Sequence, residues 1–131
     1  MIYLDSSALI KLVLDERESA DLELWLSGRS HEPLVSSELA TVEVIRSIRR
    51  LNPPSLTVAR AILGPLSLIP LSNRVVEGAA DLPDPLLRSL DALHLASALT
   101  VVEELTTFVT YDRRLSAAAT AAGLDVIHPG N

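Results

Sequence analysis

The 131-residue chain contains no cysteine, and its aromatic residues are limited to one tryptophan, one phenylalanine and two tyrosines. Without cysteine the chain has no disulfide, no thiolate metal site and no cysteine nucleophile. So few aromatic rings argue against a platform on which nucleic-acid bases stack. No apolar run approaches the roughly 18 residues of a membrane span, and the first residues include no basic segment. We therefore expect a cytoplasmic protein that does not contact a membrane.

Positive charge is also scarce, because 17 acidic residues face 11 basic ones and the formal net charge is −6. A protein that binds nucleic acid by simple electrostatics is usually basic. Binding to nucleic acid would therefore require a divalent metal held by carboxylates, or local arginine patches. The composition, with 48% hydrophobic and 21% charged residues, is that of an ordinary globular protein. We expect a single domain over residues 1–131.

Short apolar runs alternate with longer amphipathic segments along the chain. The runs predict strands at residues 1–4, 34–35, 66–71, 107–111 and 125–127. Helices are predicted at residues 6–14, 18–29, 38–51, 55–63, 73–81, from 89 onward and at 113–122, with Ser36 and Ser37 as cap candidates. This alternation favours a three-layer, doubly wound α/β fold, in which helices cover both faces of a mainly parallel sheet.

Three aspartates occupy positions that fit a site at the edge of such a sheet. Asp5 follows the first predicted strand and Asp112 the fourth, and ligands of parallel sheets bind beyond the carboxyl ends of the strands. Aspartate is also a favoured helix N-cap, which explains Asp5 equally well. Asp91 heads a core-facing stripe formed by Leu95, Ala98 and Val102. A buried, unpaired charge is costly, so Asp91 must cap its helix, bind a cation or face a polar site.

The predicted helix over residues 38–51 carries two glutamates. Glu38 lies in the first turn, where the helix dipole sufficiently explains a carboxylate. Glu43 lies mid-helix, beside an apolar stripe formed by Ala40, Val44, Ile48 and Leu51. Arginines follow two of the acidic residues: Arg46 and Arg50 after Glu43, and Arg113 and Arg114 after Asp112. These arginines are either solvated surface charge or contacts for phosphate groups.

Four carboxylates that converge would repel one another, and a hard cation relieves that repulsion. Mg²⁺ and Mn²⁺ prefer oxygen ligands and bridge to substrate phosphates. Such a site generates a hydroxide nucleophile and stabilises the leaving oxygen of a phosphodiester. His94, one turn after Asp91, is interpreted as a packing histidine rather than a ligand.

Four segments resemble the signature segments of PIN-domain ribonucleases, specifically the small VapC-type toxins of bacterial toxin–antitoxin pairs. They are residues 4–9, 39–43, 90–96 and 110–115, in this order along the whole chain. The resemblance implies that Asp5, Glu43, Asp91 and Asp112 bind Mg²⁺ or Mn²⁺, with Ser6 and Thr110 as supporting hydroxyls. Serine follows Asp5 where threonine is common in the family.

The same resemblance implies endonuclease activity on RNA, a homodimer that can assemble further with a cognate antitoxin, and inhibition by an antitoxin segment in a hydrophobic groove. The first two predicted helices carry more apolar surface than one sheet face uses. Trp25 is explained either by core packing or by such a groove. The groove candidates are Leu9, Leu12, Val13, Leu22, Trp25 and Leu26.

Two other interpretations fit parts of the pattern. A phospho-acceptor receiver domain has a similar length and an acidic Mg²⁺ pocket, but resembles this chain less, since receivers carry paired acids after the first strand and a lysine after the last. The only lysine here is Lys11, in the first predicted helix. A catalytically inert PIN-like binding module is the third interpretation, which the intact set of four acidic residues disfavours.

Overall fold

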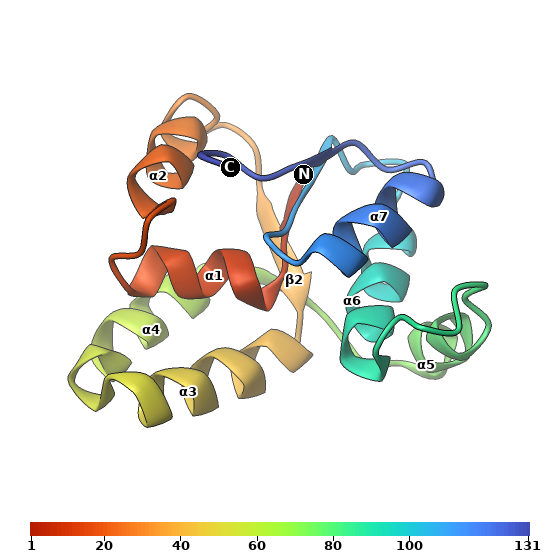
Figure 1. Ribbon diagram of the computed structural model, residues 1–131, viewed down its shortest axis with the longest axis horizontal. Coiled ribbons are helices and arrows are strands. Elements are labelled where there is room, and N and C mark those ends of the chain that lie inside the picture. Colours follow the sequence, from red (N-terminus) through yellow and green to blue (C-terminus); the bar gives the residue numbers. More distant parts are fainter.

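A computed structural model describes all 131 residues and contains one five-stranded sheet with helices on both of its faces (Figure 1). All strand pairs are parallel, and the strand order is β3-β2-β1-β4-β5. The strands are β1 (Ile2–Leu4), β2 (Leu34–Ser37), β3 (Ser67–Ile69), β4 (Thr107–Val109) and β5 (Val126–Ile127). The predicted doubly wound α/β fold is therefore confirmed.

Seven α-helices and one 3₁₀ turn follow the predicted order. They are α1 (Ser6–Val13), α2 (Ser19–Ser27), α3 (Leu39–Leu51), a 3₁₀ turn (Pro53–Ser55), α4 (Leu56–Leu63), α5 (Asn73–Ala80), α6 (Ser89–Leu99) and α7 (Arg113–Ala121). None of them is both long and apolar enough to cross a membrane.

The side chains of β1 alternate between two hydrophobic cores, because successive residues of a strand point to opposite faces. Ile2 and Leu4 pack with residues of α1, α2, α3 and α4, including Leu22 and Val44. Tyr3 packs on the other face, with residues of α6 and α7. Figure 1 shows the two groups of helices on either side of the sheet. Burial on both faces explains why β1 is apolar without interruption.

The structure corrects three local predictions. Ser36 does not cap α3 but lies within β2, where its hydroxyl donates to the Leu4 carbonyl oxygen at 2.6 Å. Ser37 does accept a hydrogen bond from the Leu39 N–H, at 3.1 Å. Leu51 and Val102, predicted to be buried, are 58% and 46% exposed. Leu51 is the last residue of α3 and Val102 follows the end of α6, so the helical periodicity that predicted their burial ends at these positions.

The connections reverse direction at β1. The chain first proceeds outward from β1 to β2 and β3, and then returns to add β4 and β5 on the other side of β1. The crevice beyond the carboxyl ends of β1 and β4 is thus a topological switch point, the usual ligand site of open parallel sheets. Asp5 and Thr110 directly follow these two strands.

Candidate active site at the carboxyl edge of the sheet

Asp5 directly follows β1, and a hydrogen bond connects it to Thr110, which directly follows β4. Its Oδ1 accepts hydrogen bonds from the Ala8 N–H at 3.0 Å and the Ser7 hydroxyl at 2.6 Å, and it thereby caps α1. Its Oδ2 accepts from the Thr110 hydroxyl at 2.5 Å. The side chain is 3% exposed, and burial raises its pKa, although His94 and the hydrogen-bond donors partly offset that effect. The capping interpretation of Asp5 is therefore confirmed, and its second oxygen also links the end of β1 to the residue after β4.

The segment after β4 is tied to this aspartate. Besides donating to Asp5, the Thr110 side-chain oxygen accepts a hydrogen bond from the Asp112 N–H at 3.1 Å. Asp112 in turn caps α7, because its Oδ1 accepts from the Leu115 N–H at 2.8 Å. No protein group donates to the other carboxylate oxygen of Asp112, which leaves that oxygen free for a ligand.

Glu43 is held by donors from two other helices. Its Oε1 accepts a hydrogen bond from the Ser6 hydroxyl at 2.5 Å and lies 2.6 Å from His94 Nε2. Burial raises the pKa of this carboxyl, but the hydrogen bonds from His94 and Ser6 outweigh burial and leave the pKa below its ordinary value. Glu43 is therefore ionised at neutral pH.

His94 is a buried link between the core and the site. It is 2% exposed, and the Tyr3 hydroxyl lies 2.7 Å from its Nδ1. Burial and, to a smaller extent, the charge of Asp5 raise the pKa of Tyr3 far above its ordinary value. The phenol therefore keeps its proton and can donate a hydrogen bond to Nδ1. Nε2 then carries the hydrogen that bonds to Glu43. The prediction that His94 packs in the core is confirmed by its burial. The prediction missed the contact between His94 and Glu43. The position of His94, one helical turn after Asp91, was the signal in the sequence that could have indicated it.

Asp91 differs from the other acids because no protein donor contacts its carboxylate. Burial raises its pKa first, and the charges of Asp112 and Asp5 raise it further, with a smaller contribution from Glu43. These interactions place Asp5, Glu43 and Asp112 within electrostatic reach of Asp91. The fold thus brings the N-caps of α1 and α7 to the switch point together with residues of α3 and α6.

The donor set suits a hard cation, since it consists of carboxylates that repel one another. As they stand, no three of these side chains converge closely enough to hold one metal ion together. Mg²⁺ does not require such a cage, because it usually binds one or two carboxylates and completes its shell with waters and substrate phosphates. Asp91 and the free oxygen of Asp112 fit this mode.

Glu38 lies apart from this network. It is exposed, and its Oε1 accepts a hydrogen bond from the Leu71 N–H at 2.7 Å, at the end of β3. Its side chain makes no capping bond to α3. The carboxylate therefore has a structural role, but it acts on the neighbouring strand end rather than on its own helix.

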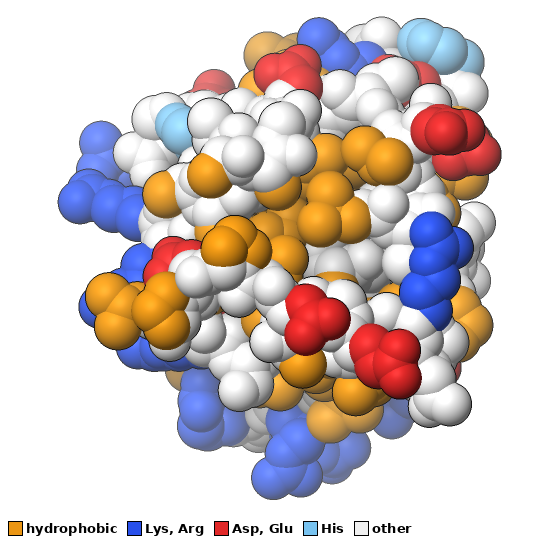
Figure 2. Space-filling model, turned by 90° about the vertical axis from the view of Figure 1, so that its right-hand side faces the viewer, with side chains coloured by type: hydrophobic (Ala, Val, Ile, Leu, Met, Phe, Trp, Pro, Cys, Tyr) orange, Lys and Arg blue, Asp and Glu red, His pale blue; other side chains and the backbone are white.

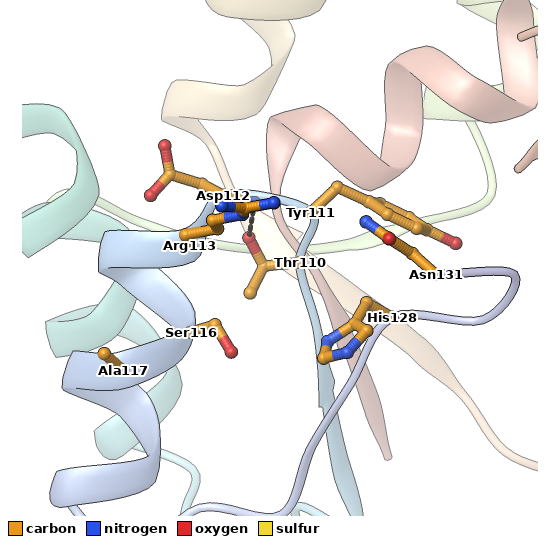
Figure 3. A pocket seen from close by; sticks show the side chains of 8 residues that line it. All are labelled: Thr110, Tyr111, Asp112, Arg113, Ser116, Ala117, His128 and Asn131. Carbon is orange, nitrogen blue, oxygen red and sulfur yellow. Dashed lines mark hydrogen bonds between the residues drawn. The ribbon is translucent and has the colours of Figure 1, made fainter. Parts of the chain in front are cut away.

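Two cavities extend from the acidic residues, and arginines line both. A cavity of about 710 Å³ is lined by Glu43 and by Arg46, Arg49 and Arg50, and none of these arginines forms an ion pair. Arg49 was not among the arginines predicted from the sequence, because it does not lie on the same flank of the helix as Glu43. The second cavity, of about 320 Å³, is lined by Asp112 and Arg113 (Figure 3). Arg114 lines neither cavity.

The predicted apolar groove is only partly available. Leu9 and Leu22 are completely buried in the core and cannot contact a partner. Leu12 and Val13 line a cavity of about 310 Å³ between α1 and α2. Trp25 is partly buried outside this cavity, with the Arg29 guanidinium 4.0 Å from its ring centre. Four of the six predicted residues therefore retain some exposure: Leu12, Val13, Trp25 and Leu26.

Comparison with known proteins gives consistent matches. Residues 2–121 match the PIN-domain family model. Ribonuclease VapC35 of Mycobacterium tuberculosis is 44% identical over 132 residues, which span 99% of this chain and 98% of that protein. The crystal structure of M. tuberculosis VapC20, described as a Sarcin-Ricin loop cleaving toxin, superposes with a TM-score of 0.72 at 18% identity, covering 98% of this chain and 100% of that one. VapBC2 from Rickettsia felis, crystallised with a promoter DNA fragment, gives 0.75 at 15% identity, covering 98% and 99%.

Proposed function

Because this chain belongs to the PIN-domain family and, within it, to the VapC ribonuclease toxins of toxin–antitoxin pairs, we propose that it hydrolyses RNA phosphodiester bonds at the site formed by Asp5, Glu43, Asp91 and Asp112. The observation that carries this assignment is the gathering of carboxylates at the switch point, where burial first, and then the charges of Asp112, Asp5 and Glu43, raise the pKa of Asp91. The family match leaves the receiver-like alternative without support.

Mg²⁺ or Mn²⁺ bound here would lower the pKa of a water molecule and neutralise charge on the phosphodiester. Asp91 and Asp112 would hold the ion, since each has an oxygen without a protein donor. Asp5, fixed by Thr110, would orient the ion's water shell. Glu43 is kept ionised by Ser6 and His94, and its Oε2 has no protein partner. This oxygen would accept a proton from the attacking water as the bond from phosphorus to the leaving oxygen breaks.

The direct test is cleavage of a mixed-sequence RNA by the purified protein with Mg²⁺ or Mn²⁺, compared with excess EDTA. We expect cleavage that requires the metal and that returns when metal is restored. Asp91→Asn, purified in the same way, controls for contaminating nuclease. Cleavage that persists in EDTA, or equal cleavage by the variant, would overturn the assignment.

The arginines supply the positive charge that the whole chain lacks. Arg46 and Arg50, together with Arg49, line the cavity that begins at Glu43, and Arg113 lines the one that begins at Asp112. We propose that they bind RNA phosphates, with Arg114 adding charge at the periphery. Replacing Arg46 and Arg50 with alanine should reduce the log–log salt slope of RNA binding by roughly 0.7 for each lost contact with single-stranded RNA. Arg60→Ala, at an exposed position of α4, is the control.

The partner of a VapC toxin is its antitoxin, and we propose that a segment of the cognate antitoxin packs against the exposed part of the α1–α2 surface. Trp25 offers the largest apolar anchor there, and tryptophan is enriched among residues that dominate binding energy. Trp25→Ala should weaken antitoxin binding by about 2 kcal/mol or more and leave metal-dependent cleavage measurable. Leu24, 73% exposed on the same helix, provides the matched control. Equal affinities for both variants would refute this placement.

We also propose that the protein forms a homodimer and acts in the cytoplasm, where its RNA substrates are. Figure 2 shows apolar side chains gathered near the middle of the face formed by α5, α6 and α7. Cavities of about 290 and 380 Å³ on this face are lined mainly by apolar residues, and Leu86 beside them is 73% exposed. Leu86→Glu should therefore lower the molar mass measured by light scattering.

A further inference from the structure

The cavity beside Asp112 contains polar side chains that have no partner within the protein. It has a volume of about 320 Å³ and lies between α7 and the segment that follows β5. In Figure 3 the Ser116 hydroxyl and the His128 ring face each other across it, with Thr110 between them and Arg113 near Asp112. The side chains of Arg113, Ser116, His128 and Asn131 form no hydrogen bond or ion pair within the protein. Ser116 is partly buried, and Arg113, His128 and Asn131 are exposed, so these groups are open to a ligand.

The wall that carries His128 is fixed in place. The Tyr111 hydroxyl donates to the Pro129 carbonyl oxygen at 2.7 Å, which ties the last residues of the chain to the loop after β4. The Lys11 ammonium lies 4.8 Å from the centre of the Tyr111 ring and forms an ion pair with Glu18 at 2.6 Å. These contacts brace the wall against α1 and α2. The cavity is therefore a formed feature of the fold and not a gap beside a loose end.

We propose that this cavity binds one ribonucleotide of the RNA strand, next to the phosphodiester that is cleaved. This inference rests on the proposed nuclease function, because Thr110 and Asp112 belong to both the cavity and the acidic site. A nucleotide bound here would be the RNA residue adjacent to the phosphodiester at the metal-binding carboxylates.

The lining matches the three parts of a ribonucleotide. Arg113, at the acidic end, offers a guanidinium to a phosphate, for which its planar set of donors is well suited. The Ser116 hydroxyl can donate to or accept from a ribose 2′-hydroxyl, the group that distinguishes RNA from DNA. His128 and the Asn131 amide present donors and acceptors to the edge of an unstacked base, which is how proteins read single-stranded RNA. Only two of the eight lining residues are hydrophobic, so an apolar peptide segment fits the cavity poorly.

Binding can be measured without cleavage. Backbone amide spectra of the metal-free protein would be recorded during titration with AMP, CMP, GMP and UMP, and then with the 2′-deoxy forms. We expect shifts at Ser116 and His128 with at least one ribonucleotide, and weaker binding of its deoxy form. Ser116→Leu, which fills the cavity, should abolish these shifts. Shifts that bypass these residues, or that persist in Ser116→Leu, would overturn the proposal.

Cleavage kinetics provide the second measurement. The double variant Ser116→Ala/His128→Ala should raise KM for a short RNA about tenfold, in keeping with the loss of two hydrogen bonds, while kcat changes much less. Thr120→Ala, one turn later on α7, and His31→Ala, an exposed histidine outside the cavity, are the matched controls. A fall in kcat with unchanged KM would contradict a substrate-binding role.

The outcomes separate this proposal from the proposed function. If the wild type cleaves RNA but neither the shifts nor the KM change appears, the function stands and the nucleotide site is wrong. If the wild type does not cleave RNA but ribonucleotides still shift Ser116 and His128, the site stands and the cleavage assignment fails. If the double variant weakens antitoxin binding and leaves KM for RNA unchanged, the cavity belongs to the protein partner and our inference is overturned.

Discussion

Glu43 and Asp91 belong to the same acidic cluster, yet their surroundings shift the pKa values of the two carboxyl groups in opposite directions. Ser6 and His94 donate hydrogen bonds to Glu43, and the pKa of its carboxyl falls below the ordinary value in spite of burial. Asp91 has no protein donor, and burial together with the charges of Asp112 and Asp5 raises its pKa. The fold therefore stabilises one negative charge internally and leaves the other to be stabilised by something it binds.

From this difference we infer different roles for Glu43 and Asp91. A carboxylate that is already held by the protein has a fixed position and protonation state, which suits an oxygen that handles a proton. A carboxylate that is destabilised by its neighbours gains most from a cation, because the cation removes the repulsion. Variants that exchange charge for a neutral amide should separate these two roles.

The largest effect is expected from Asp91→Asn. We expect cleavage to fall by more than about a hundredfold, beyond the losses typical of residues that only support metal ligands. Thermal stability without metal should rise, because one repelling charge is removed. Cleavage assays, Mn²⁺ titration calorimetry and thermal unfolding in EDTA measure the three quantities. Retained Mn²⁺ affinity would show that Asp91 is not the residue that needs the cation.

Glu43→Gln should also reduce cleavage but should change stability in the opposite direction. The amide keeps an acceptor oxygen but loses the charge that strengthens the bonds from Ser6 and His94, a cost of about 1 kcal/mol. Urea denaturation in EDTA measures this change. Glu38→Gln is the matched control, since Glu38 accepts only the Leu71 N–H and should retain near-normal cleavage. Equal catalytic losses in the two variants would remove the distinction between the glutamates.

His94→Ala tests whether the internal donor sets the behaviour of Glu43. We expect a loss of cleavage of roughly tenfold to hundredfold, the range found for groups that support metal ligands. Tyr3→Phe removes only the hydroxyl beside Nδ1 and should have a smaller effect on cleavage. Because both variants disturb buried groups, urea denaturation must confirm that each is folded at the assay temperature. If Tyr3→Phe impaired cleavage as severely as His94→Ala, loss of packing rather than the contact with Glu43 would explain both.

The smallest effect concerns pH. A carboxyl with a raised pKa binds more protons in the folded than in the unfolded protein, so it makes stability fall as pH rises above its ordinary value of 3.8. Glu43 acts in reverse, since its pKa is lowered and its contribution is lost as pH falls below 4.5. The stability advantage of Asp91→Asn over wild type should therefore shrink between about pH 7 and pH 4, where Asp91 becomes protonated. Urea denaturation in EDTA across this range measures it, and a constant difference would contradict the raised pKa.

The order of the elements could be predicted because it depends on local patterns. Apolar runs separated by amphipathic segments define strands and helices without knowledge of their neighbours, and all five strands and seven helices appear in the predicted order. Errors lie at the ends of elements, as at Ser36, Leu51 and Val102. Burial there depends on whether another part of the chain covers the residue, which periodicity alone does not reveal.

The sequence by itself determined the chemistry available at the site: four carboxylates in the right contexts, oxygen ligands without cysteine, and arginines after Glu43 and Asp112. Only the tertiary structure decided how each charge is stabilised. The contacts of His94 with Glu43 and Tyr3 join residues separated by 51 and 91 positions, and the cavity beside Asp112 forms where the chain end packs against the loop after β4. Hydrogen bonds and cavities depend on distances of a few ångströms between remote segments, which no spacing along one chain encodes.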